Sequence, residues 1–181
     1  MEDSELLNEF LNGNDQAFKE LVSRHHKKLY NFIWLKIGNH DDTSDVCQNS
    51  FIQAYKKAEQ FHGKASFKSW LYKIAINLCK NYYRSKERQR IDNNIDPDEL
   101  DKPVHDTGWE KLIIDEKKTL IQLAIKKLPS KQRTTIELRY FQECTLLQIS
   151  EIMDCPVSTA KANYYHALKA LREIMAGDNH E

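Results

Sequence analysis

The sequence of 181 residues lacks any long apolar run and holds only five glycines and four prolines. No stretch approaches the roughly 18 apolar residues that a membrane-spanning helix needs. The first five residues carry three acids, where a secretion signal carries positive charge and then a long apolar segment. With 40% hydrophobic and 30% charged residues, the composition is typical of helical globular proteins rather than disordered or strand-rich ones. We therefore predict an all-α protein of the cytoplasm, without membrane insertion.

Paired cysteine motifs are also missing. Cys47, Cys79, Cys144 and Cys155 lie far apart, with no CxxC pair and no histidine at zinc-finger spacing. Neither a metal site nor a disulfide framework is indicated, so we expect reduced, partly buried thiols. The sequence shows no acid, base and nucleophile set and no glycine-rich phosphate loop. We therefore predict no catalytic residue, no metal, no cofactor and no enzymatic activity.

The charge sums to zero over the chain but is strongly segregated. Residues 68–90 carry seven basic side chains and one acidic one, a local net of +6, whereas residues 91–110 carry seven acids and one lysine, a net of −6. The acidic stretch contains Pro97, Pro103 and Gly108 and has no apolar periodicity, so it cannot form a core. We interpret it as a flexible linker, although a long surface loop within one domain would look similar.

This division predicts two small helical domains joined by the linker. They are an N-terminal helical bundle at 1–90, the acidic linker at 91–112 and a C-terminal helix-turn-helix domain at 113–181.

Two amphipathic helices are expected in the first domain. The first follows the capping pair Asn14-Asp15, and its apolar residues recur at helical spacing. They are Phe18, Leu21, Val22, Leu29, Phe32 and Ile33. The second helix follows a polar break at 38–42, with an apolar stripe of Cys47, Phe51, Ala54, Tyr55 and Ala58. Asp45, Gln48 and Ile52 fall on another face of that helix, which suits either a protein partner or solvent.

The segment from Phe67 to Arg90 predicts a helix with two distinct faces. Its apolar side consists of Phe67, Trp70, Leu71, Ile74, Leu78 and Tyr82. A second side, here called the basic face, consists of Lys73, Asn77, Lys80, Arg84 and Arg88. A row of cations follows a phosphate backbone, and rings such as Phe61 and Tyr83 beside it suit stacking on unpaired bases. The alternative is that the rings are core and the cations only solubilise the helix.

The C-terminal segment carries a helix-turn-helix pattern. After a helix that ends at Leu128-Pro129, a second runs from Gln132 to about Phe141. Thr145 caps a short helix from Leu146 to Met153, and Ser158 caps a longer one to about Met175. The inward side of the long helix is predicted as Ala160, Tyr164, Ala167, Leu168, Leu171 and Met175. The outward side, here called the recognition face, consists of Lys161, Ala162, Tyr165, His166 and Lys169. Such a face reads bases in a major groove, although a structural helical hairpin would also fit.

Taken together, these segments resemble the extracytoplasmic-function (ECF) group of the sigma-70 family, over nearly the whole chain apart from the linker. Asp45-Val46-Cys47-Gln48-Asn49-Ser50-Phe51 is similar to the family's D-x-x-Q-x-x-F helix. Phe61-His62-Gly63 and the run from Phe67 to Asn77 are similar to its promoter-melting segment. Leu128-Pro129, Leu138-Arg139-Tyr140 and Ile149 to Met153 are similar to its minus-thirty-five domain. Asn81, Ala162, Asn163 and His166 depart from the residues that many relatives carry at those positions.

The resemblance implies a sigma factor that guides core RNA polymerase to promoter DNA, with an anti-sigma factor left open as a further partner. It implies polymerase contacts by Asp45, Gln48 and Ile52. Minus-ten DNA is assigned to Phe61, Lys73, Asn77, Lys80, Arg84 and Arg88, with Phe61 and Asn77 gripping a flipped base. Minus-thirty-five DNA is assigned to Ser158, Thr159, Lys161, Ala162, Tyr165, His166 and Lys169. A stand-alone helix-turn-helix regulator is the competing interpretation, and it would bind duplex DNA without polymerase.

Overall fold

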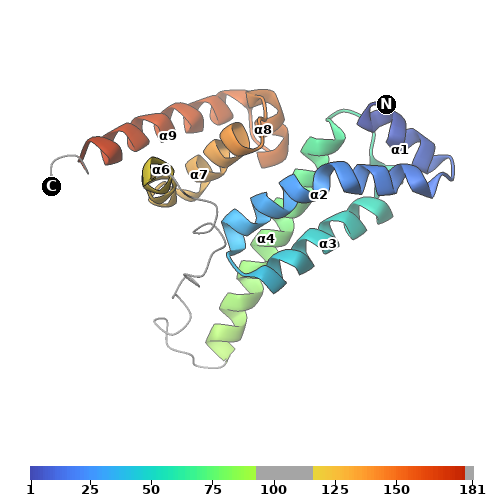
Figure 1. The fold of residues 1–181 in the computed structure, drawn as a ribbon, viewed down its shortest axis with the longest axis horizontal. Helices are drawn as coiled ribbons and strands as arrows, with labels where there is room; N and C mark the ends of the chain where they lie inside the picture. The colour runs from blue at the N-terminus through green and yellow to red at the C-terminus, as the bar shows by residue number, and fades with distance from the viewer. Residues whose placement is uncertain (93–115, 178–181) are drawn as a thin grey trace. The chain divides into compact units, whose positions relative to one another are not determined.

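A computed structural model describes residues 1–92 and 116–177, and every element in these ranges is helical (Figure 1). The first part contains α1 (Asp3–Leu11), α2 (Asp15–Ile37), α3 (His40–Lys56), the 3₁₀ turn η1 (Ala58–Gln60) and α4 (Phe67–Asp92). The second contains α6 (Glu116–Lys126), α7 (Ser130–Ile136), the π-helical turn η2 (Glu137–Phe141), α8 (Leu146–Met153) and α9 (Val157–Gly177).

The chain divides into two compact units, Met1–Thr107 and Gly108–Glu181. The predicted all-α, two-domain class is confirmed. The predicted acidic linker at 91–112 lies outside the described residues, except for its first two positions, which end α4. Within the described ranges, no helix is sufficiently long and apolar to pass through a bilayer.

Helix α1 was not predicted, because its nine residues carry only a short apolar signal. A capping box starts it, in which the backbone N–H of Glu2 donates to the Glu5 carboxylate at 2.7 Å. Its buried side chains are Leu6 and Leu7. The first turn also supplies Asp3, which α2 uses as an anchor.

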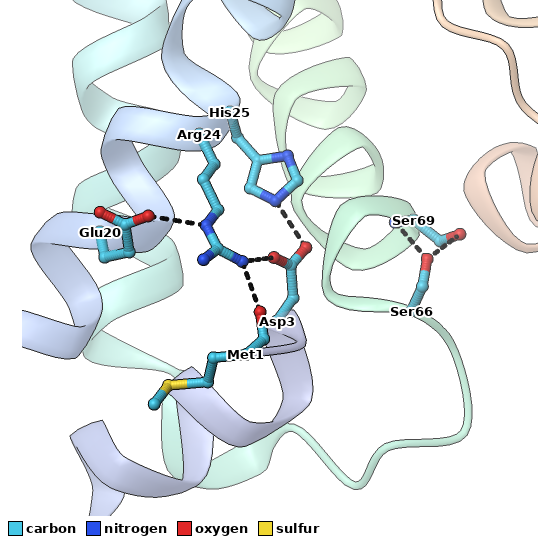
Figure 2. Close-up of polar contacts among 7 residues, drawn as sticks. All are labelled: Met1, Asp3, Glu20, Arg24, His25, Ser66 and Ser69. Atoms are coloured by element: carbon cyan, nitrogen blue, oxygen red, sulfur yellow. Dashed lines mark hydrogen bonds and ion pairs between the residues drawn. The ribbon is translucent and has the colours of Figure 1, made fainter.

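Polar contacts fix α1 on α2, as Figure 2 shows. The Asp3 carboxylate lies 2.6 Å from Nε2 of His25 and 3.5 Å from the Arg24 guanidinium. Arg24 also donates to the Met1 carbonyl at 2.8 Å and to Glu20 at 2.8 Å. The hydrogen bond to Glu20, more than that to Asp3, raises the pKa of Arg24 above its ordinary value. The position of α1 therefore depends on side chains more than 20 residues away in sequence.

Helices α2, α3 and α4 enclose the core of the first unit. Asn14 caps α2 as predicted, and α2 ends at Gly38, whose φ of 72° is the left-handed conformation that glycine adopts most easily. Asn39 then caps α3 at once, so the polar break is only two residues long. Phe32 and Tyr72 are fully buried, with ring centroids 5.1 Å apart. The short connection through Gly38 and Asn39 sets α2 and α3 antiparallel, and both pack against the first half of α4.

The buried side of α4 is broader than predicted. Phe67, Leu71 and Ile74 are buried as expected, whereas Trp70, Leu78 and Tyr82 are only half-buried. A second row is buried as well, consisting of Tyr72, Ala75, Ile76 and Cys79. The physical reason is that α4 packs against both α2 and α3, so two of its sides are covered. Two further expectations need correction, since Val22 is half-buried and Tyr55 is 48% exposed.

The second unit is built around Ile125, Leu128, Ile136 and Ala167. Tyr164, Leu168, Leu171 and Ile174 of α9 pack against this cluster. Met175, predicted to face inward, is instead 40% exposed, and Ile174 takes the inward position. The helix predicted from Gln132 begins earlier, at Ser130, and changes to a π-helical turn at Glu137.

The turn between α8 and α9 has the predicted form with one correction. Thr145 caps α8 in a reciprocal capping box with Gln148, as its sequence position indicated. Asp154 ends α8 with φ of 55°, in the left-handed region. Because α9 begins at Val157, Ser158 lies in its first turn instead of capping it.

Candidate nucleic-acid interface

The basic face of α4 points away from the core of the first unit. Asn77, Lys80, Arg84 and Arg88 are exposed, and Lys73 is half-buried. They occupy the side opposite to Leu71 and Cys79, which are buried against α2 and α3. The structure therefore presents four of the five residues of this face to solvent in a single row along the helix.

The loop before α4 carries Phe61, which is half-buried. Its ring centroid lies 5.2 Å from that of Trp70 and 6.5 Å from that of Phe67. The start of α4 is fixed by Ser66, whose hydroxyl accepts from the backbone N–H of Ser69 at 3.1 Å (Figure 2). Phe61 is therefore held against the first turn of α4, next to the loop.

Asn77 lies seven residues beyond Trp70, a rise of about 10 Å along the helix axis. Phe61 packs against Trp70 at the start of α4. Phe61 and Asn77, which were assigned to one flipped base, therefore lie at different heights along the axis of this helix.

Tyr83, the other ring predicted to stack on bases, is 50% exposed, and its hydroxyl donates to the Lys36 carbonyl at the end of α2. Tyr82 beside it donates to the Asp42 carboxylate of α3 at 2.8 Å. Burial, reinforced by this carboxylate, raises the pKa of Tyr82 above its ordinary value. Both tyrosines therefore connect α4 to the junction of α2 and α3.

The outer side of α3 carries Asp45, Gln48 and Ile52, all exposed, with Ile52 at 41%. Gln48 and Ile52 line a groove of about 700 Å³ between α2 and α3, here called the α2–α3 groove. Its remaining lining residues are Phe18, Val22, His26, Tyr30, His40, Ser44, Phe51, Tyr55 and Lys56.

Sequence reasoning missed the α2 wall of this groove. The signal was present, because Phe18, Val22, His26 and Tyr30 recur at intervals of four residues and so share one side of α2. Of these four, Phe18 and Val22 were assigned to the apolar side of the predicted helix, and His26 and Tyr30 were assigned to no surface.

The recognition face of α9 is exposed throughout. Lys161, Ala162, Tyr165, His166 and Lys169 are all exposed, as are Ser158 and Thr159 in the first turn. The Lys161 ammonium lies 5.9 Å from the centroid of the Tyr165 ring, and Lys169 lies 3.9 Å from a carboxylate oxygen of Glu173. This side of the helix-turn-helix is therefore polar, accessible and carries two cations.

Comparison with known families identifies both units of the chain. Residues 21–89 match Sigma-70 region 2, and residues 118–171 match Sigma-70, region 4. The chain belongs to the sigma-70 family. Sigma factors are transcription initiation factors, and the basic face and the α2–α3 groove lie within or beside the region 2 match, whereas the recognition face lies within the region 4 match.

Curated relatives place the chain in the ECF group of this family. It is 33% identical over 172 residues to the ECF RNA polymerase sigma-E factor of Haemophilus influenzae, covering 91% of this chain and 90% of the relative. It is 32% identical to the ECF RNA polymerase sigma factor SigW of Bacillus subtilis, covering 89% and 90%.

Solved structures agree on the fold at low identity. CnrH in complex with the cytosolic domain of CnrY has a TM-score of 0.73 at 20% identity, covering 97% of this chain and 98% of that one. The sigma factor RpoE from Bartonella quintana, in complex with the anti-sigma factor NepR, has a TM-score of 0.66 at 20% identity, covering 88% and 96%. The sigma-70 fold therefore extends over both units of this chain.

Proposed function

We propose that this sigma factor divides its work between three surfaces. The α2–α3 groove with Asp45, Gln48 and Ile52 binds core RNA polymerase. The basic face of α4, with Phe61, engages the minus-ten element as it opens. The recognition face of α9 binds the minus-thirty-five element as duplex DNA.

One observation carries the proposal, namely that the cations of α4 form a row along one exposed side of the helix, which is continuous with the exposed side of its buried first half. Phosphate neutralisation requires such accessible cations, and the zero net charge of the whole chain would otherwise argue against a nucleic-acid partner. Lys80, Arg84 and Arg88 are exposed. They support a backbone-tracking role better than Lys73, which is half-buried.

The groove supports the polymerase contact. It is open and lined largely by apolar and aromatic side chains, and Gln48 supplies a polar group at its edge. A mixture of this kind suits an amphipathic helix of a protein partner, since helix-in-groove docking needs apolar pockets with a polar rim. Asp45, one turn away on the exposed side of α3, extends this surface.

The chain itself performs no catalysis under this proposal, because RNA synthesis is the work of the polymerase, and it acts in the cytoplasm where core polymerase is found. CnrH was solved with the cytosolic domain of CnrY, and the sigma factor RpoE with the anti-sigma factor NepR, which supports an anti-sigma factor for this chain as well. Co-expression of the tagged chain with candidate inhibitors, followed by run-off transcription, tests that part, and an inhibitor that binds without reducing transcription would speak against it.

The test of the main proposal uses purified core polymerase and a promoter selected from a randomised library with the wild-type protein. We expect Ile52→Asp to abolish assembly with core, Arg84→Ala to weaken promoter opening, and Tyr165→Ala to weaken binding upstream without affecting assembly. The stand-alone regulator predicts instead a specific gel shift of duplex DNA without core polymerase. Such a shift, together with unchanged transcription by all three variants, would refute the proposal.

A further inference from the structure

The second half of α4 extends beyond its hydrophobic contacts. Cys79, at 3% exposure, is the last buried side chain along the described part of this helix. Tyr82 is half-buried, and every side chain from Tyr83 to Gln89 is exposed. Figure 1 shows α4 continuing past the junction of α2 and α3. Three cations of the basic face, Lys80, Arg84 and Arg88, lie in this half, where polar contacts can contribute to their position.

A polar cluster supplies such contacts. The Tyr82 hydroxyl donates to Oδ2 of Asp42 at 2.8 Å, and Nζ of Lys86 lies 3.8 Å from the same oxygen. The Lys86 ammonium also lies 5.4 Å from the centroid of the Tyr82 ring. We call Asp42, Tyr82 and Lys86 the Asp42 tether.

The anchor of this tether is itself well fixed. Asp42 lies in the first turn of α3, and its backbone N–H donates to Oδ1 of the capping residue Asn39 at 3.0 Å. A carboxylate in the first turn of a helix is also favoured by the helix dipole. The backbone that carries the receiving carboxylate is therefore fixed at the junction of α2 and α3.

The tether lies on the side of α4 opposite to the basic face. At about 100° per residue, Tyr82 and Lys86 each lie about 160° from the centre of the basic face. Holding α4 from this side leaves Lys80, Arg84 and Arg88 pointing outward. The contact with Asp42, together with the hydrogen bond from the Tyr83 hydroxyl to the Lys36 carbonyl, holds the second half of the helix in this orientation.

We infer that Asp42 and Tyr82 are positioning residues for promoter opening, which set the register of the basic face on the DNA backbone, while the exposed ion pair of Lys86 with Asp42 contributes little. This inference rests on the proposed role of the basic face in engaging the minus-ten element. Without the tether, the cations remain on the helix but lose their fixed direction, so each capture of the DNA backbone must also order the helix. Opening of duplex DNA suffers, while assembly with core polymerase, which uses the outer side of α3, does not.

Two conservative variants isolate the hydrogen bond. Tyr82→Phe keeps the ring and removes the hydroxyl, whereas Asp42→Asn keeps an oxygen that accepts from Tyr82 and removes the charge that pairs with Lys86. We expect Tyr82→Phe to lower open-complex formation on a duplex promoter about fivefold, measured by permanganate reactivity of unpaired thymines. Asp42→Asn should stay within about twofold of wild type. The double variant Tyr82→Phe with Asp42→Ala should form no less open complex than Asp42→Ala alone, because both changes remove the same hydrogen bond.

A second template separates positioning from simple loss of stability. The same promoter with a pre-opened minus-ten bubble has unpaired thymines from the start, so run-off transcription is compared on both templates. On the bubble, Tyr82→Phe should match the wild type, because the step that needs the directed cations has been bypassed. An equal deficit on both templates, or wild-type opening of the duplex by Tyr82→Phe, would overturn the inference.

The Arg84→Ala variant shows which of the two hypotheses has failed. If Arg84→Ala is impaired on the duplex while Tyr82→Phe is not, only the tether is refuted. If neither variant is impaired, the role of the basic face is refuted as well.

Discussion

Replacing Lys80, Arg84 and Arg88 by alanine removes three exposed cations from the basic face and leaves the buried side of α4 unchanged. Each phosphate contact contributes about 0.7 to 0.9 to the slope of log affinity against log salt, depending on whether the strand is single or paired. Three lost contacts therefore reduce the slope by about 2 to 3. Lys73 is kept because it is half-buried.

The slope translates into a measurable difference between the two proteins. Between 50 and 200 mM salt, three contacts amount to about a 20- to 40-fold loss of affinity. The wild-type holoenzyme should lose that much more promoter affinity than the triple variant over this range. Fluorescence anisotropy of a labelled promoter with reconstituted holoenzyme gives both slopes, and the contribution of core polymerase cancels in the comparison.

A matched control distinguishes contact from net charge. Lys19, Lys27 and Lys57 are exposed lysines of the same unit that lie outside the basic face. Replacing these three by alanine changes the net charge by the same amount and should leave the slope at its wild-type value. Equal slopes for wild type and the basic-face variant, or equal losses in both variants, would refute the assignment.

Three further predictions concern the groove, the core and pH. Ile52→Asp should weaken assembly with core polymerase at least tenfold in a pull-down titration. Its circular dichroism should be unchanged, because the Ile52 side chain is 41% exposed. Normal assembly would exclude the α2–α3 groove as the polymerase-binding surface. Leu7→Ala should cost about 2–5 kcal/mol of unfolding free energy in urea, since Leu7 is 2% exposed; a loss below about 1 kcal/mol would mean that α1 is dispensable for folding. Burial raises the pKa of the Cys47 thiol from about 9 to about 11. The folded state therefore holds this proton more tightly than the unfolded state does. As pH rises from 9 to 11, the free energy of unfolding should fall by about 2 kcal/mol more for the wild type than for Cys47→Ala. Unfolding followed by tryptophan fluorescence gives both pH profiles, and parallel profiles would contradict the prediction.

Local signals predicted much of this fold. The caps Asn14 and Thr145 lie at the starts of α2 and α8, and the left-handed Gly38 lies at the end of α2. Each of these acts within one turn of helix, so a few neighbouring residues are sufficient to identify it. The helix-turn-helix could be predicted for the same reason, because its short turn lies between a capped helix, α8, and a helix with apolar periodicity, α9.

Contacts between distant residues were the ones missed. Tyr82 falls on the apolar side of the helical wheel, but its hydroxyl donates a hydrogen bond to Asp42, which lies 40 residues earlier in the sequence. His25 shows no carboxylate at helical spacing, yet Asp3 reaches it across 22 residues. Periodicity describes which side of a helix is covered, and it does not specify which residue of another helix covers it.

The same limit explains the candidate sites. Exposure of the basic face and of the recognition face followed from the wheel, because each lies on a different side of its helix from the apolar residues. The α2–α3 groove did not, because its walls belong to two helices whose packing fixes the space between them. Met175 and Ile174 exchange roles near the end of α9, where a small rotation decides which side chain reaches the core.

Mapping of RNA 5′ ends made by purified core polymerase on randomised DNA, with and without this protein, tests the central claim most directly. The account predicts new start sites that appear only when the protein is present, share two upstream sequence elements, and weaken when the basic face is replaced. Identical transcripts with and without the protein would contradict it.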